Sequence, residues 1–178
     1  MKSVLISIKP RWCEFIAIGK KTIEVRKTKP RIDTPFKCYI YETKTKDFYS
    51  VLHETTMGKV IGEFICSKIT EFESEFWDDE TYERIQTIIK DCERYFESGE
   101  YEYETVATNE DEKYKENWLC KQSCVPWEEM RKYVGAGIKE FYGWHISNLK
   151  IYDTPKELSE FRIKRPPQSW CYVEEVQK

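Results

Sequence analysis

Lys21, Glu24 and Arg26 are three charged residues that lie close enough in the sequence to act on one ligand. If the segment around them forms a strand, Glu24 and Arg26 point to the same side, because side chains alternate along a strand. A carboxylate accepts hydrogen bonds from an exocyclic amine or a ring N–H, while ammonium and guanidinium groups donate to phosphate and carbonyl oxygens. This spacing is compatible with a site for a nucleotide-like ligand.

The same residues also have plainer interpretations and a catalytic one. Glu24 and Arg26 can form a structural ion pair, and Lys21 can lie in solvent at the start of a strand. If Lys21 were instead partly buried beside Arg26, the like charge would favour its neutral form and let it act as a base or nucleophile. In such an enzyme Glu24 could activate a water molecule. The residue types alone leave these interpretations open.

Two elements before these charged residues would position them. The β-branched and apolar run from Ser3 to Ile8 predicts a buried strand. Pro10 suits the first turn of a helix over residues 11–18, and Gly19 is placed to end that helix. Over residues 20–27 apolar and polar residues alternate, which predicts a half-buried strand with the charged side chains on one face.

Several aromatic residues could lie near this site. Trp12 and Trp144 have apolar neighbours and are predicted to be core residues. Trp170 follows a polar, proline-stiffened loop, so it is the better candidate to stack on a base. His145 has no acidic partner that the sequence can place, which favours a hydrogen-bonded structural role.

The remaining segments complete a mixed α+β pattern. Further strands are expected at 36–42, 59–72, 141–152 and 168–173, and helices at 80–96, 126–134 and 154–161. Strands that suit antiparallel pairing, separated by few helices, favour a small mixed β-barrel over a doubly wound parallel sheet.

The net charge of −3 hides an uneven distribution along the 178 residues. Residues 1–60 hold 13 Lys and Arg against 6 Asp and Glu, residues 61–130 hold 7 against 20, and residues 131–178 hold 9 against 6. The basic ends are typical of an anion-binding surface, although such runs also occur on simple solvated faces. The acidic middle predicts a helical insertion, a lid, or a surface for a basic partner.

Composition excludes several classes of protein. With 40% hydrophobic and 15% aromatic residues, the chain is not disordered throughout. No apolar run approaches the roughly 18 residues needed to cross a bilayer, and Lys9 ends the first apolar run too early for a secretory signal. We therefore expect a cytoplasmic protein without membrane contact. The seven cysteines predict free thiols, and Cys120 and Cys124 lack the second ligand pair of a zinc site, so no metal or other cofactor is expected.

The segment from Gly19 to Arg26 resembles the signature of the ASCH domain, Gly-x-Lys-x-x-Glu-x-Arg after a short helix. The resemblance includes the strand around Trp144 and His145, and it covers about residues 1–72 and 124–176. It implies a PUA-like β-barrel with a cleft beside the first helix, lined by the signature Lys, Glu and Arg. Members of the family are thought to bind RNA or modified nucleosides, and one bacterial branch hydrolyses N4-acylated cytidine.

That hydrolytic branch pairs the signature Lys with a Thr three residues later, where this sequence has Glu24. The substitution removes a hydroxyl that could orient or attack the substrate. We therefore expect weak or no release of acetate from N4-acetylcytidine.

Together these observations predict a single α+β domain over residues 1–178, an ASCH-like, PUA-like barrel with flanking helices and an acidic helical insertion at about 73–121. The domain is expected to bind RNA or a modified nucleoside or nucleotide in a basic cleft. The expected ligand-binding residues are Lys9, Lys21, Glu24, Arg26, Arg165, Ser169 and Trp170. One alternative is a hydrolase, either an amidohydrolase or a ribonuclease, with Lys21 and Glu24 as catalytic residues. Another is a protein-interaction module whose acidic insertion binds a basic partner.

Overall fold

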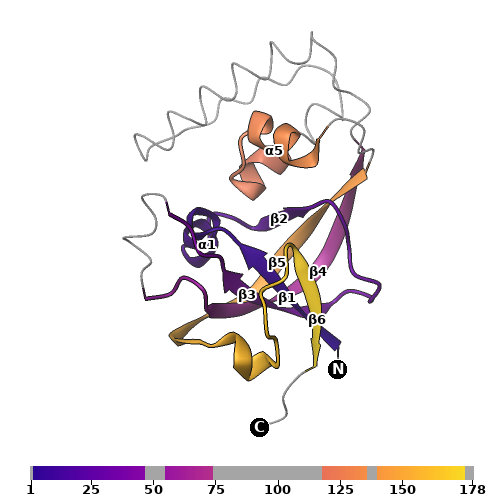
Figure 1. Ribbon diagram of the computed structural model, residues 1–178. Coiled ribbons are helices and arrows are strands. Elements are labelled where there is room, and N and C mark those ends of the chain that lie inside the picture. Colours follow the sequence, from indigo (N-terminus) through magenta and orange to yellow (C-terminus); the bar gives the residue numbers. More distant parts are fainter. Residues whose placement is uncertain (1, 47–54, 74–117, 136–139, 175–178) are drawn as a thin grey trace, which may run out of the picture.

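The computed structural model describes residues 2–46, 55–73, 118–135 and 140–174 (Figure 1). The predicted helix at 80–96 and most of the predicted acidic insertion lie outside these described residues. The elements in chain order are β1 (Lys2–Ile8), α1 (Pro10–Ala17), β2 (Ile23–Arg26), β3 (Phe36–Glu42), β4 (Val60–Glu73), α5 (Trp127–Val134), β5 (Glu140–Lys156), the 3₁₀ helix η1 (Leu158–Phe161) and β6 (Trp170–Glu174). Residues 118–123 form a further helical segment ahead of α5.

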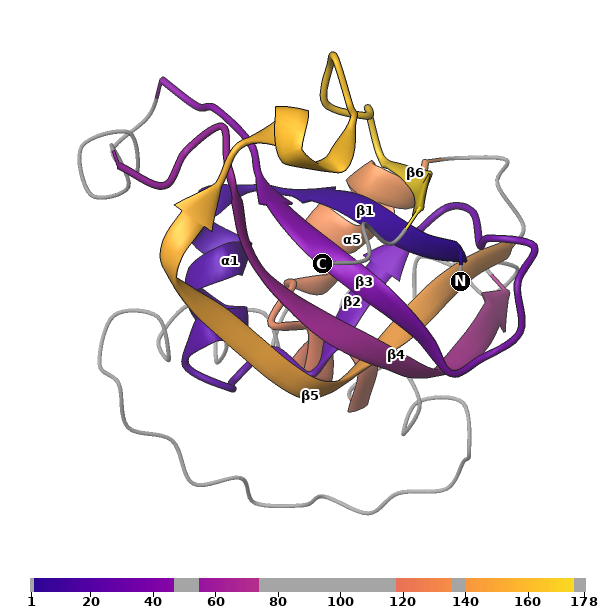
Figure 2. The same cartoon turned by 90° about the horizontal axis from the view of Figure 1, so that it is seen from below.

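The strands form one six-stranded sheet in the order β2-β5-β4-β3-β1-β6. β1 pairs with β3 in parallel, and every other neighbouring pair is antiparallel, so the sheet is mixed. Figure 2 shows that the sheet curls strongly, with α1 and α5 on its concave side. A mixed sheet with a few short helices confirms the predicted α+β class.

The two faces of the sheet are both covered. On the inner face, alternate residues of β1 and β3, such as Val4, Ile6 and Ile40, pack with Trp12 and Ile16 of α1. On the outer face, a separate cluster joins the intervening strand residues to η1 and β6; it contains Leu5, Tyr39, Tyr41, Val60, Phe161 and Val173. Because side chains alternate along each strand, the same strands supply both layers.

The helix α1 spans Pro10–Ala17, within one residue of the predicted range at each end. Pro10 occupies its first turn, where a missing N–H costs nothing, and Gly19 follows it with a φ of +75°, which glycine adopts without strain. Trp12, Cys13 and Ile16 form its buried side. The helix therefore fixes the start of the chain that leads into β2.

Two predictions about local structure are wrong. All four residues of β2 are buried, so this strand is not half-buried, because its charged face is covered by other parts of the chain. The helix predicted at 154–161 is only the four-residue η1, because β5 continues through Lys156, which pairs with Val60. Within the described ranges no helix is long and apolar enough to cross a membrane.

Candidate functional site

Strand β2 directs the signature charges to the inner face of the sheet. β2 pairs with β5 so that Glu24 lies opposite Trp144 and Arg26 opposite Tyr142. Directly opposed residues of an antiparallel pair point to the same side of the sheet. Since Trp144 and Tyr142 belong to the inner core, Glu24 and Arg26 also face inward.

Lys21, Glu24 and Arg26 form one buried ion network. The Lys21 ammonium lies 3.2 Å from Glu24 Oε2, and Arg26 Nη2 lies 2.9 Å from Glu24 Oε1. The three side chains are 1%, 7% and 8% exposed, respectively. The interpretation of a solvated Lys21 is therefore wrong, whereas the structural ion pair between Glu24 and Arg26 does form and is buried.

Backbone carbonyls from distant segments complete this ion network. The Lys21 ammonium donates to the carbonyl of Ser123 at 2.6 Å, and its nitrogen lies 5.5 Å from the centre of the Trp12 ring. Arg26 Nη2 donates to the carbonyl of Ser7 at 2.6 Å. The register of β1 with β6 ends at Ile6. Arg26 therefore binds the backbone of β1 at the residue that follows the last paired one.

Glu42, which is not among the predicted site residues, adds a second buried carboxylate to the inner face. Its row in β3 runs Phe36, Cys38, Ile40, Glu42, so strand alternation already places it inward. Burial raises the pKa of the nearby Cys13 thiol well above its usual range. The negative charges of Glu42 and Glu24 raise this pKa further, and the positive charges of Arg26 and Lys21 lower it only in part. Cys13 thus remains a protonated thiol at the edge of the ion network.

Apart from the carboxylate oxygens of Glu42, three buried polar atoms beside or within the network have no hydrogen-bond partner among the described residues. They are the indole Nε1 of Trp144, the guanidinium Nε of Arg26, and Oε2 of Glu24, which has the ion pair with Lys21 but accepts no well-directed hydrogen bond. Two of these atoms are donors and one is an acceptor. Unsatisfied buried polar groups are rare and point to a function or to a bound molecule.

Ser169 and Trp170 lie close to the network through Ser7. The backbone N–H of Ser7 donates to the carbonyl of Ser169 at 2.9 Å. The Trp170 ring lies 6.0 Å from the Trp144 ring, and its indole N–H donates to the hydroxyl of Thr28 at 3.0 Å. Trp170 is thus half-buried and partly held in place.

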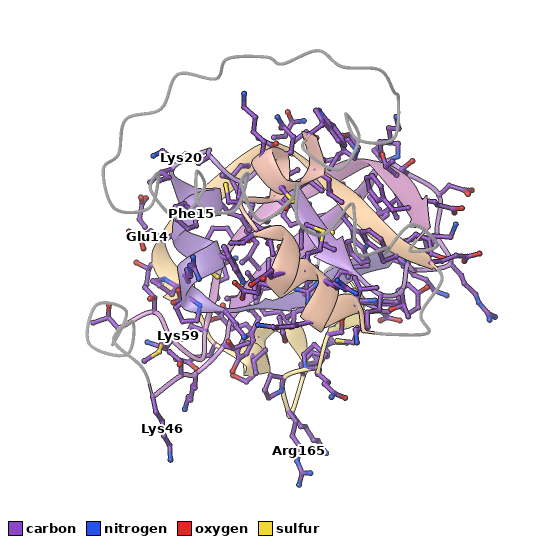
Figure 3. All side chains as sticks on the ribbon, turned by 90° about the horizontal axis from the view of Figure 1, so that it is seen from above. Glu14, Phe15, Lys20, Lys46, Lys59 and Arg165 are labelled. Carbon is purple, nitrogen blue, oxygen red and sulfur yellow. The ribbon has the colours of Figure 1, made fainter. Side chains whose placement is uncertain are left out.

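Lys9 and Arg165 are not brought into the network. Lys9 is exposed just before α1, and Figure 3 shows Arg165 extending away from the body of the molecule. The structure therefore gathers Lys21, Glu24 and Arg26, places Ser169 and Trp170 beside them, and leaves the other two predicted residues in solvent.

The remaining candidates have structural surroundings. Trp12 and Trp144 are buried, which confirms their prediction as core residues. His145 Nε2 lies 2.8 Å from the Thr70 hydroxyl, and burial, followed by the charge of Lys68, lowers the pKa of the imidazole. Over the described ranges, six cysteines are free thiols and no cluster of three or more His, Cys, Asp or Glu could hold a metal ion.

Comparison with solved structures gives the fold a name. The crystal structure of ASCH from Zymomonas mobilis matches with a TM-score of 0.58, covering 97% of this chain and 88% of that chain at 18% sequence identity. The fold is that of an ASCH domain. A mutant of the same Zymomonas mobilis protein matches over 98% of this chain and 92% of its own, with a TM-score of 0.58 and 17% identity.

This match confirms the resemblance that the Gly19–Arg26 segment indicates, at the level of the fold. No protein-family model matches the sequence, and a search of curated proteins finds no match. In this ASCH fold, the Lys, Glu and Arg of the signature form the buried ion network.

Proposed function

We propose that this ASCH-fold chain binds the base of a pyrimidine nucleoside, either free or within RNA, at the ion network. The observation that carries the proposal is a set of three buried atoms that have no hydrogen-bond partner among the described residues: Trp144 Nε1, Arg26 Nε and Glu24 Oε2. Two donors and one acceptor are complementary to a group with two acceptors and one donor. Cytosine and uracil present that pattern along their Watson–Crick edges, whereas guanine presents one acceptor and two donors.

The charge of the inner face supports an uncharged ligand there. Lys21 and Arg26 are matched in number by the buried carboxylates of Glu24 and Glu42. An additional buried charge would carry a large desolvation cost without a partner of its own, whereas a neutral base would not. A phosphate group is therefore a poor occupant of the network itself.

Ligand entry requires movement of a covering element, because the three network side chains are at most 8% exposed. Residues 118–125 touch the network through the carbonyl of Ser123. The same segment is held to the start of β2, since the Thr22 N–H donates to the Gln122 carbonyl at 2.8 Å. We expect a bound nucleoside to change amide hydrogen exchange more strongly at residues 118–125 than in the other described helices.

A hydrolase that uses Lys21 as its nucleophile is less well supported by the geometry. Both partners of the Lys21 nitrogen, the Glu24 carboxylate and the Ser123 carbonyl, are acceptors, which suits the ammonium form. An ammonium group has no lone pair with which to attack a carbonyl. This arrangement favours a binding role over an amidohydrolase.

The experiment compares two tryptophan variants by titration with cytidine, uridine, N4-acetylcytidine, adenosine and guanosine. Trp144→Phe keeps an aromatic ring but removes the indole N–H, and loss of one hydrogen bond should weaken pyrimidine binding about 3- to 10-fold. Trp170→Phe is the matched control, because its N–H already donates to Thr28. We expect the control to bind pyrimidines as the unchanged protein does.

Two results would contradict the proposal. One is equal binding of guanosine and cytidine by the unchanged protein, a measurement that does not depend on any variant folding. The other is equal pyrimidine affinity of the Trp144→Phe and Trp170→Phe proteins, with thermal unfolding showing that both are folded. Release of acetate from N4-acetylcytidine, lost in Lys21→Met, would support the hydrolase instead.

A further inference from the structure

The outer face carries a groove that has no part in the ion network. It has a volume of about 790 Å³ and lies between η1 and the residues Lys44 and Gly58. Its floor is apolar and includes Tyr41, Leu158 and Ile163. We call this site the outer groove.

Three cations line the outer groove: Lys44, Arg162 and Lys164. None of them forms an ion pair with another described residue. The one carboxylate among the lining residues, Glu157, is already engaged, because it lies 3.6 Å from Lys59 and takes part in the capping box of η1. The outer groove therefore has an excess of positive charge above an apolar floor.

Local backbone geometry favours the positions of two of these residues, Lys44 and Arg162. Gly58 has a φ of +81°, and a Cβ at this position would come within 2.5 Å of Cε of Lys44, so the missing side chain makes room for the lysine stem. Arg162 is in the left-handed region with a φ of +58°, fixed where its N–H donates to the Ser159 carbonyl at the end of η1. The fold thus fixes the backbone of Arg162 and leaves room for the stem of Lys44.

One segment connects the outer groove to the ion network. Arg162, Lys164 and Pro166 line the groove. The next residue, Pro167, accepts a hydrogen bond from the Ser7 hydroxyl at 2.6 Å, and the Ser7 carbonyl is the group that Arg26 holds. A chain-like ligand that follows this segment would pass from the groove to the network.

We propose that the outer groove binds the phosphate groups of a single RNA strand. Phosphates need cations without carboxylate partners, and the charge-balanced ion network offers none, whereas the outer groove offers three. Its apolar floor suits the less polar faces of ribose and base. The choice of RNA rests on the proposed function, while the anionic character of the ligand follows from the groove itself.

The test compares two triple variants that remove the same charge. The groove variant carries Lys44→Gln, Arg162→Asn and Lys164→Gln; Asn is chosen because it tolerates a positive φ. The control variant carries Lys2→Gln, Lys68→Gln and Lys150→Gln, three exposed lysines outside the groove. The probe is a fluorescein-labelled single-stranded oligouridine of about ten nucleotides, titrated at several salt concentrations.

We expect the groove variant to bind the oligonucleotide at least about tenfold more weakly at low salt, with a log–log salt slope smaller by about 2, since each lost phosphate contact removes about 0.7. The control variant should lose less than about twofold, because long-range charge alone contributes little. Equal losses in the two variants, or none in the groove variant, would overturn the proposal.

Two further measurements distinguish RNA binding at the outer groove from binding of a free polyphosphate and from binding of a base at the ion network. If sodium tripolyphosphate competes as well as the oligonucleotide at equal charge, the ligand is a free polyphosphate and the RNA strand is wrong. Free uridine isolates the proposed function: its binding should be the same in the groove variant and the unchanged protein. Loss of oligonucleotide binding in the groove variant alongside no uridine binding by either protein would support the groove and contradict the base site.

Discussion

The ion network and the outer groove are both built from charged side chains, but they stand in opposite environments. In the ion network two cations surround Glu24 at 2.9 and 3.2 Å, and all three side chains are buried. In the outer groove Lys44, Arg162 and Lys164 share an open surface without a free carboxylate among the lining residues. One region has its charges balanced within the fold, and the other does not.

This difference separates stability from binding. A buried charge without its partner is strongly destabilising, so the residues of the ion network are held by the fold whether or not they meet a ligand. Exposed, unpaired cations contribute little to folding, and their clustering is explained better by something that binds to them. The comparison predicts that substitutions in the ion network lower the free energy of unfolding, whereas substitutions in the outer groove leave it almost unchanged.

The largest effect is expected from Glu24→Gln. This change removes the carboxylate that Lys21 and Arg26 share and leaves two buried cations beside each other. Breaking a buried pair costs about 3–5 kcal/mol, so urea unfolding should show a loss of that order in the free energy of unfolding. The matched control is Glu71→Gln, which removes an exposed carboxylate that pairs with Lys29 and should cost less than about 1 kcal/mol.

If Glu24→Gln and Glu71→Gln were equally mild, the ion network would not be a structural element, and the contrast with the outer groove would disappear. A full loss of folding in Glu24→Gln would agree with the prediction but leave its size unmeasured. In that case the free energy of unfolding is measured on the double variant that combines Glu24→Gln with Lys21→Met. This variant lacks one of the two uncompensated cations and should therefore recover part of the lost stability.

A smaller effect is expected from Arg26→Lys, which keeps the charge but not the shape of the side chain. The guanidinium joins Glu24 to the Ser7 carbonyl, and a single ammonium cannot reproduce this fork. Loss of the hydrogen bond to a charged donor predicts a decrease of about 1–3 kcal/mol in the free energy of unfolding. Arg165→Lys, at an exposed side chain that extends away from the body of the molecule, should be close to neutral. An Arg26→Lys protein as stable as the Arg165→Lys protein would show that charge alone is needed.

Part of the ion network could be predicted from the sequence. The turn signals Pro10 and Gly19 define α1, and strand alternation places Glu24 and Arg26 on one face. The inward orientation of Glu42 could be predicted in the same way, because Glu42 is the last of the inward-facing residues of β3. Local pattern therefore accounts for which residues share a face.

Burial of the network was not predictable from the same pattern. Lys21 is buried because the carbonyl of Ser123, more than a hundred residues away in the chain, lies over it. The outer groove depends in the same way on η1 packing beside residues Lys44 and Gly58. Both features come from long-range packing, which propensity and periodicity do not encode.

The smallest effect on stability is expected from the groove variant itself. Lys44, Arg162 and Lys164 have no described ion-pair partner, so Lys44→Gln, Arg162→Asn and Lys164→Gln together should change the free energy of unfolding by less than about 0.5 kcal/mol. Any change should be a gain at low salt that vanishes at high salt, because like charges repel one another and salt screens exposed charges. The loss in Glu24→Gln should persist at high salt, since its charges are buried. Urea unfolding of both variants at two salt concentrations measures this contrast. A salt-resistant loss above about 1 kcal/mol in the groove variant would show that its cations hold the fold together, as those of the ion network do.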